Sequence, residues 1–310
     1  MDANQWQKIT IESRQEMVNS ISDFLVGTIE AGVEMAAPDE PGCGKIFAFF
    51  KGSNTHLQER EALSAQISTY LSEVASTYSL PVPSYIIEQI NEKDWTKRWK
   101  SYFRPFSIVP GLMIVPSWEK YTLQSGEQAL VLNPGMAFGT GLHVTTYFGL
   151  QLMREQLKNM PGTTVLDVGT GTGILAMTSL LFGAGSVVAI DIDEAAVTVT
   201  QQNAARNGFA DKIQVSTTPA SEVNGSFELV VANLIYDVII ELAPDLQRLT
   251  AEGGFLVLSG IPTGNQLDEI KQDFIQRGFS FKKERVGGEY AALLLEKKQS
   301  TLKLGVDQGK

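Results

Sequence analysis

The chain has 310 residues, of which 43% are apolar, so it is long enough for about two domains with a substantial buried core. No stretch approaches the roughly 18 to 20 consecutive apolar residues of a membrane span, and the first residues, MDANQWQKIT, lack the pattern of a secretion signal. A net charge of -10 disfavours direct binding to a phosphate backbone. We therefore expect a cytoplasmic protein, monomeric, with no direct nucleic-acid contact and no membrane contact.

Metal-binding residue types are scarce. Cys43 is the only cysteine, which excludes an internal disulfide, and the only histidines are His56 and His143. Because zinc and most transition metals are held by several Cys or His side chains, no metal site is predicted.

Residues 1–90 alternate between extended and helical patterns in the order βαββαβ. The first expected helix presents Val18 and Ile21 on one face, and the second presents Ile67 and Leu71. This order is typical of a ferredoxin-like α+β domain, a scaffold whose function cannot be read from its topology.

Residues 91–106 mix both signs of charge with five aromatic side chains, and we interpret them as a connector between two domains. A second domain is expected over residues 107–298, followed by a frayed tail over 299–310. From residue 163 onward, short β-branched runs alternate with helical segments, which is typical of a doubly wound parallel sheet. The last two runs flank a Gly-Gly turn and predict an antiparallel hairpin.

The main chemical signal is VLDVGTGTGIL, in which Asp167 precedes the glycines Gly169, Gly171 and Gly173. Glycines permit a tight turn from strand to helix and let a ligand lie against bare backbone at the positive end of the helix. The spacing is D-x-G-x-G-x-G, which differs from the G-x-G-x-x-G of dinucleotide sites. An acidic residue before the turn suits a ligand carrying an ammonium and a sulfonium better than one carrying a pyrophosphate.

Polar residues follow two further expected strands. Asp191 ends a strand about twenty residues after the glycine turn, where a carboxylate can accept hydrogen bonds from both ribose hydroxyls of an adenosine. Asp193 is expected to cap the next helix. Asn233 ends the fourth strand of this domain, beside the crevice where open α/β sheets bind ligands.

The segment NPGMAFGTGLHVTT lies ahead of an expected helix and can wrap a ligand. Thr145 or Thr146 is expected to cap that helix and offer a hydroxyl to the ligand. Phe138 is expected to cover an adenine or face a sulfonium. For His143, a structural role in the loop and a direct catalytic role both remain open.

NPGMAFGTGLHVTT, VLDVGTGTGIL, AIDID and VVANLI, together with DWTKRWKSYFRPF and IVPSW, resemble the bacterial methyltransferases of large-subunit ribosomal protein eleven, the PrmA family. The resemblance implies a Rossmann-like class I methyltransferase domain with a mostly parallel seven-stranded sheet, preceded by a ferredoxin-like substrate-recognition domain. It implies S-adenosyl-L-methionine as cofactor and a large-subunit ribosomal protein as substrate, methylated on lysine or N-terminal amines. The cofactor contacts carried over are Thr146, Gly169, Asp191 and Asn233.

Two positions depart from the family pattern. Asn133 stands where aspartate is usual before Pro-Gly, and Tyr290 stands where a tryptophan is common. Both departures bear on substrate details more than on cofactor binding. No catalytic general base is predicted.

Three alternatives stay open at this stage: the same chemistry on lysines of another, non-ribosomal protein, a cofactor-binding module without turnover, and a dinucleotide oxidoreductase. The glycine spacing argues against the last. The sequence NLIY at the end of the fourth strand differs from Asn-Pro-Pro-Tyr. That motif is typical of the methyltransferases that act on planar amide or adenine nitrogens. A tetrahedral amine is therefore the expected acceptor.

Overall fold

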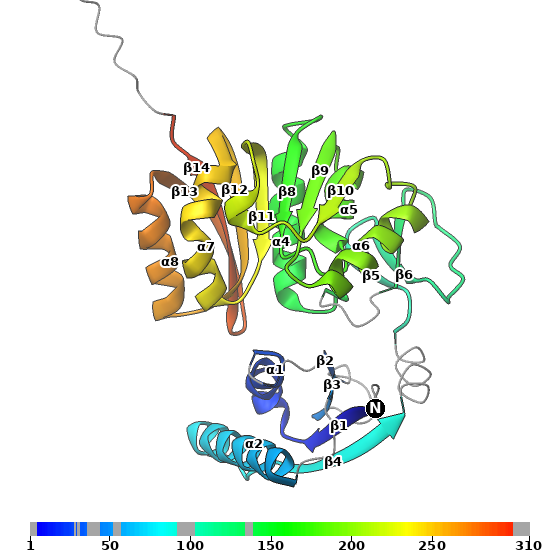
Figure 1. Cartoon of the computed structure of the whole chain (residues 1–310), viewed down its shortest axis with the longest axis vertical. Helices are drawn as coiled ribbons and strands as arrows, with labels where there is room; N and C mark the ends of the chain where they lie inside the picture. The colour runs from blue at the N-terminus through cyan, green and yellow to red at the C-terminus, as the bar shows by residue number, and fades with distance from the viewer. Residues whose placement is uncertain are drawn as a thin grey trace, which may run out of the picture. The chain divides into compact units, whose positions relative to one another are not determined.

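The computed structural model describes residues 5–27, 29, 32–35, 44–51, 57–91, 103–133 and 139–299. The chain divides into two units, Met1–Arg104 and Pro105–Lys310 (Figure 1). Most of the expected connector and all of the tail beyond Gln299 lie outside the described residues. Within the described ranges, no helix is long and apolar enough to cross a membrane.

The first unit carries a four-stranded antiparallel sheet in the order β2-β3-β1-β4, with the helices α1 and α2. Its elements are β1 (Gln5–Glu12), η1 (Gln15–Met17), α1 (Val18–Gly27), β2 (Gly32–Met35), β3 (Lys45–Lys51), α2 (Leu57–Tyr78) and β4 (Ser84–Asn91). The order along the chain is the βαββαβ expected of a ferredoxin-like fold.

One face of this sheet forms the core of the unit. Alternate residues of β1, including Ile9 and Ile11, are fully buried against Ile21 of α1 and Leu71 of α2. The period of two in the strand and of about 3.6 in the helices matches this one-sided burial. The amphipathic pattern of the sequence therefore predicted this core correctly.

The second unit opens with a three-stranded sheet, β5-β6-β7, that the sequence analysis did not resolve. Its strands are β5 (Phe106–Val109), β6 (Leu112–Pro116) and β7 (Gln128–Leu132). Gly111, with φ of 81°, lies in the tight turn between β5 and β6, a backbone conformation that favours glycine. β7 then pairs with β6 in parallel and leads toward the segment before α4.

The large sheet has seven strands in the order β10-β9-β8-β11-β12-β14-β13. β8 to β12 are parallel, and β14 runs antiparallel to both of its neighbours, as the terminal hairpin predicted. The elements are α4 (Val144–Leu157), β8 (Thr164–Val168), α5 (Ile174–Leu181), β9 (Ser186–Ile190), α6 (Glu194–Arg206), β10 (Ile213–Ser216), η2 (Ala220–Glu222), β11 (Phe227–Asn233), α7 (Tyr236–Leu249), β12 (Thr250–Pro262), α8 (Asn265–Gln276), β13 (Phe279–Gly287) and β14 (Tyr290–Lys297).

Helices cover both faces of this sheet (Figure 1). α7 and α8 pack over β11, β12 and β13, while α4 contacts β11, β12 and β14 and α5 contacts β8 and β9. Double coverage explains the nearly continuous apolar strands. The strand order reverses between β8 and β11, and open α/β sheets bind ligands at such a reversal, beside the carboxyl ends of the strands.

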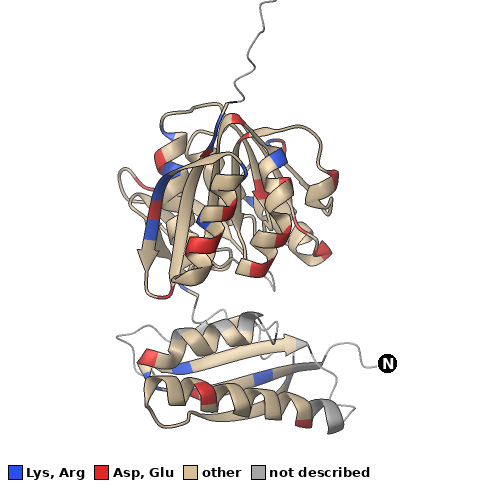
Figure 2. Ribbon diagram, turned by 90° about the vertical axis from the view of Figure 1, so that its left-hand side faces the viewer, with Lys and Arg blue, Asp and Glu red and all other residues tan. Residues whose placement is uncertain are grey.

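The outer strand β13 carries a row of charged residues (Figure 2). Lys283 and Arg285 form ion pairs with Glu155 of α4, and Lys282 pairs with Glu296 of β14. Charges on an edge strand oppose pairing with another chain. These charges therefore disfavour pairing of β13 with a strand of another chain.

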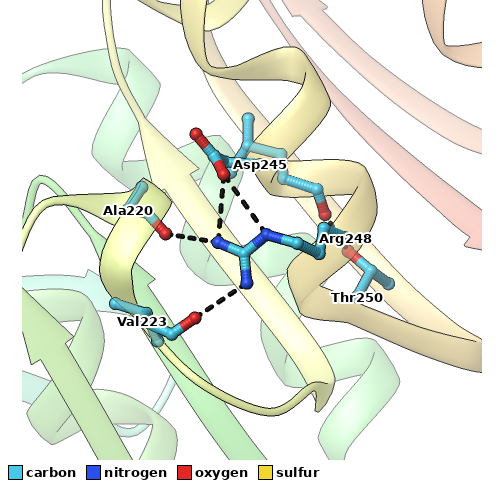
Figure 3. A network of polar contacts seen from close by, with 6 residues as sticks. Ala220, Val223, Asp245, Arg248 and Thr250 are labelled. Atoms are coloured by element: carbon cyan, nitrogen blue, oxygen red, sulfur yellow. Dashed lines mark hydrogen bonds and ion pairs between the residues drawn. The ribbon is translucent and has the colours of Figure 1, made fainter.

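Arg248 of α7 fixes the short helix η2 (Figure 3). Its guanidinium donates hydrogen bonds to the carbonyl oxygens of Ala220 and Val223, each at 2.7 Å, and contacts Asp245 at 3.0 Å. A planar fork of donors suits two carbonyls and a carboxylate at once. One side chain thus satisfies both ends of the turn that precedes β11.

We predict that Arg248→Met lowers the free energy of unfolding by about 1–3 kcal/mol, because two carbonyls lose their donor. Urea unfolding followed by circular dichroism measures this. Arg277→Met is the matched control, since among the described residues its guanidinium bonds to Asp273 alone, in a half-buried i,i+4 pair, and no carbonyl would lose a donor, so it should cost less than about 1 kcal/mol. Equal costs for both variants would contradict the role given to Arg248.

Candidate active site

The glycine turn follows β8 and leads directly into α5. Gly169, Gly171 and Gly173 have φ of 73°, 56° and 80°, the left-handed region that side chains with a Cβ rarely adopt. Gly173 is the N-cap residue of α5. The sequence therefore predicted the turn correctly, and its backbone favours glycine at all three positions.

At two of these glycines, packing within the protein also leaves no room for a side chain. A Cβ on Gly169 would overlap Leu234, which directly follows β11, and a Cβ on Gly173 would lie 2.8 Å from Thr200 of α6. The chain thus needs glycine at 169 and 173 to bring neighbouring elements together, whatever ligand the turn holds. Sequence reasoning assigned all three to the tight turn and to ligand approach and did not detect this packing.

Asp167 lies at the end of β8 and is fully buried. Its Oδ2 accepts hydrogen bonds from the Thr170 hydroxyl at 2.7 Å and the Ala176 amide at 3.1 Å, which fastens the turn to α5. Its Oδ1 meets no hydrogen-bond donor among the described residues. Burial raises the pKa of this carboxyl to about 7, opposed by the two hydrogen bonds and supported by the nearby charge of Asp191.

Asp191 directly follows β9 and reaches back to the glycine turn. One carboxylate oxygen accepts from the Gly171 amide at 2.8 Å, and the other accepts from the Asp193 amide at 3.1 Å. Each oxygen retains a second lone pair for a ligand hydroxyl. The position of Asp191 at the end of a strand agrees with the sequence prediction, whereas its bond to the Gly171 amide was not predicted.

Ile192, the residue after Asp191, is 87% exposed. Sequence reasoning missed this position, because the alternation of AIDID gives no sign that an isoleucine faces solvent. Asp193 caps α6 by accepting from the Ala195 amide at 2.8 Å, as expected. The next side chain after the carboxylate thus offers an apolar surface at the edge of the sheet.

Asn233 and Thr146 come together from β11 and α4. The Asn233 amide donates to the hydroxyl of Thr146 at 3.4 Å, and Thr146 is buried. The two residues are 87 positions apart in the sequence, so their contact depends on the packing of α4 against β11. Asn233 lies at the end of its strand as predicted.

The cap of α4 differs from the prediction. His143, rather than Thr145 or Thr146, is the N-cap residue, and its Nδ1 accepts from the Thr145 amide at 3.4 Å. A histidine ring nitrogen in the acceptor state replaces the expected hydroxyl. Burial lowers the pKa of His143, which favours the neutral ring that this cap requires.

The two departures from the family pattern lie near this site. The ring of Tyr290 contacts that of His143 edge-on, with centroids 4.9 Å apart. The backbone amide of Asn133 donates to the side chain of Asn203 in α6 at 2.9 Å. Phe138, expected to cover an adenine, lies outside the described residues.

The residues present fit a nucleoside that carries a cationic group. A carboxylate next to an exposed isoleucine suits a ribose and a flat base, while the unpartnered oxygen of Asp167 suits a cation. Among the described residues, no group of three or more His, Cys, Asp or Glu is arranged to hold a metal ion. A doubly wound sheet ending in an antiparallel hairpin, with this turn at its strand reversal, defines a class I methyltransferase that uses S-adenosyl-L-methionine.

Comparison with known proteins identifies the family. Residues 5–298 match the model of the ribosomal protein L11 methyltransferase family (PrmA). A ribosomal protein L11 methyltransferase of Desulfotalea psychrophila is 41% identical, with 94% of this chain and 98% of that protein covered, and one of Pelobacter propionicus is 34% identical over 93% and 96%. The chain belongs to this family.

A solved structure supports the same assignment. The ribosomal protein L11 methylase of Lactobacillus delbrueckii subsp. bulgaricus is 34% identical to this chain, with a TM-score of 0.58. The match covers 63% of this chain and all of that one. Fold and family therefore agree.

We predict that Gly171→Ala weakens S-adenosylmethionine binding while the chain still folds. A Cβ in the left-handed region costs roughly 1–2 kcal/mol, and it would stand on the backbone beside Asp191. Gly208→Ala is the matched control, because Gly208 has φ of 72° but nothing within 4 Å of its Cβ position. Calorimetric titration of both variants is the measurement, and equal affinities would remove Gly171 from the site.

Proposed function

We propose that this chain transfers methyl groups from S-adenosyl-L-methionine to lysine or N-terminal amines of ribosomal protein L11. The observation that carries the proposal is the meeting of three features at one strand reversal: the glycine turn, the Asp191 carboxylate bonded to it, and the Asn233–Thr146 pair. Membership of the family supports the substrate, because the relatives are named for it.

We assign the cofactor contacts as follows. Asp191 accepts from the ribose hydroxyls, and Ile192 packs against the adenine. The backbone of Gly169, Gly171 and Gly173 lines the methionine side of the ligand, and Asp167 faces its positive charge. Thr146 and Asn233 contact the ligand from the other side of the reversal, and Phe138 contributes to the adenine or sulfonium side.

The bound cofactor supplies an electrophilic methyl group, and the protein's task is to hold an amine in line with it, about 3 Å away. A lysine amine near pH 7 is neutral in only about one part in a few thousand. Burial lowers an amine pKa because it disfavours the cation. The half-buried Asn233 carboxamide and the neutral His143 ring border the edge of the sheet at the strand reversal. Neither adds a positive charge that would repel an incoming ammonium.

We further propose that the first unit recognises the protein substrate. Residues 1–91 contain twelve Asp or Glu against five Lys or Arg, a net charge of -7. Acidic surface attracts a basic partner and speeds its encounter. Binding energy from a remote domain can also place each target amine at the methyl group.

The direct test is methylation of purified L11 by the full chain with isotope-labelled cofactor, followed by mass spectrometry of L11 peptides. We expect label on amines of L11 and none on a control mixture of other lysine-rich proteins. Labelling of the control mixture with L11 untouched would favour the alternative, a methyltransferase for a non-ribosomal protein. Cofactor binding with no labelling of any protein would contradict an enzymatic role.

We predict that cofactor affinity rises severalfold between about pH 6 and pH 8, because Asp167 must lose its proton to face a cation. In the unliganded protein the sign is opposite for stability. The folded chain keeps this proton up to about pH 7, whereas the unfolded chain releases it near pH 3.8. The free energy of unfolding therefore falls as the pH rises from 3.8 to about 7.

Asp167→Asn tests both effects, since asparagine can keep an acceptor for Thr170 and Ala176. Its affinity should be lower and its dependence on pH weaker, and it should lose less stability as the pH rises. Calorimetric titration and thermal unfolding across the pH range measure these slopes. A variant with the same pH slopes as the wild type would show that another group is responsible.

We also predict that a chain starting near residue 105 keeps cofactor affinity but loses most activity on intact L11. The division between Arg104 and Pro105 leaves the large sheet complete in the second unit. Folding is checked first by circular dichroism, and binding and methylation are then measured on one sample. Undiminished methylation of L11 would show that the second unit recognises it alone.

A further inference from the structure

Asn203 of α6 and Asn207, the residue that caps its C-terminus, lie one helical turn apart and bond to the same edge of the chain at the end of β7. Asn207 accepts from the Val131 amide at 2.8 Å and donates to the Val131 carbonyl at 2.7 Å. Asn203 does the same with Asn133, at 2.9 Å and 3.1 Å. Each carboxamide thus takes the place of a neighbouring strand, satisfying backbone groups at an edge that β6 does not reach.

Only one of the pair also reaches the glycine turn. The Asn203 amide donates a second hydrogen bond, at 3.0 Å, to the carbonyl of Thr172. Asn207 has no bond to that turn among the described residues; its further contacts are with the Asn203 carbonyl and the Met177 sulfur. Asn203 is fully buried, so this bond is shielded from water.

These bonds fix the orientation of the Asn203 carboxamide. Its nitrogen faces two carbonyl oxygens, of Asn133 and Thr172, and its oxygen faces the Asn133 amide. The reversed orientation would set oxygen against two oxygens and nitrogen against a donor. Both amide hydrogens are therefore used, one on each side.

Thr172 connects to the chain a second time. Its hydroxyl donates to the Gly139 carbonyl at 2.6 Å. Asn133 and Gly139 flank the segment 134–138, so both flanks are tied to one residue of the glycine turn, the first through Asn203 and the second directly. Thr200, three residues before Asn203 on α6, donates to the Gly171 carbonyl at 2.8 Å.

We propose that Asn203 is a positioning residue for the methyl donor, which holds the end of β7 at a fixed place against the glycine turn. It touches neither reactant. It acts by keeping the carbonyl of Thr172 and the backbone of Asn133 together. The glycine turn and the chain after β7 then stay at a fixed distance from each other on the two sides of the cofactor site. This inference rests on the proposed cofactor site.

The pair of asparagines provides its own control. Asn203→Ala and Asn207→Ala each remove one carboxamide that bonds to β7, and we expect both to lower the unfolding temperature. Only Asn203→Ala should weaken S-adenosylmethionine binding, by at least about tenfold in Kd, with Asn207→Ala within about threefold of the wild type. Calorimetric titration of the full chain measures Kd, and thermal unfolding without cofactor measures stability.

Equal changes in Kd for the two variants would overturn the proposal and leave Asn203 a purely structural residue. So would an unchanged Kd in a folded Asn203→Ala chain. Should Asn203→Ala fail to fold, Asn203→Ser and Asn207→Ser decide. A serine hydroxyl keeps a polar group at each position, but its single hydrogen cannot bond to both Asn133 and Thr172. Only Asn203→Ser should therefore bind S-adenosylmethionine more weakly, and equal binding by the two would overturn the proposal.

Failure of the proposed function is distinguishable from failure of this inference. A wild-type chain that binds S-adenosylmethionine but methylates no L11 would contradict the proposed substrate and leave the asparagine comparison valid. A wild-type chain that binds no S-adenosylmethionine would overturn both.

Discussion

The second unit depends on how closely the chain after β11 approaches its neighbours at the strand reversal. Leu234 lies between Gly169, after β8, and Gly260, in β12, and a Cβ on either glycine would overlap it. Its amide donates to the Ser259 carbonyl at 3.1 Å. Because Leu234 is held from both sides, the preceding Asn233 is fixed at the edge of the sheet where the glycine turn begins.

The sequence predicted those parts of the fold that depend on local pattern. Apolar runs gave the strands of the large sheet, and turn residues gave the terminal hairpin and the glycine turn. Asp191 was predictable because its distance along the chain from the turn reflects one βαβ unit. Gly260 was not recognised, because its need for glycine comes from Leu234, a residue that follows another strand, β11.

The rest of the site depends on contacts distant in sequence. No local pattern shows that Asn203 replaces a β-strand partner, since an asparagine in a helix ordinarily faces solvent. The His143 cap was missed because hydroxyl and carboxamide side chains are the usual N-caps. The exposure of Ile192 follows from the course of the chain after β9, which alternation alone does not determine.

The central claim is that S-adenosylmethionine binds at the strand reversal, with its ribose on Asp191. A crystal structure of the chain with S-adenosylhomocysteine tests it most directly, because the product retains the ribose and the amino acid part. We predict that both ribose hydroxyls lie within hydrogen-bond distance of the Asp191 carboxylate and that the ligand's amino acid part lies along the glycine turn. A ligand bound elsewhere, or a ribose held by another side chain, would contradict the account.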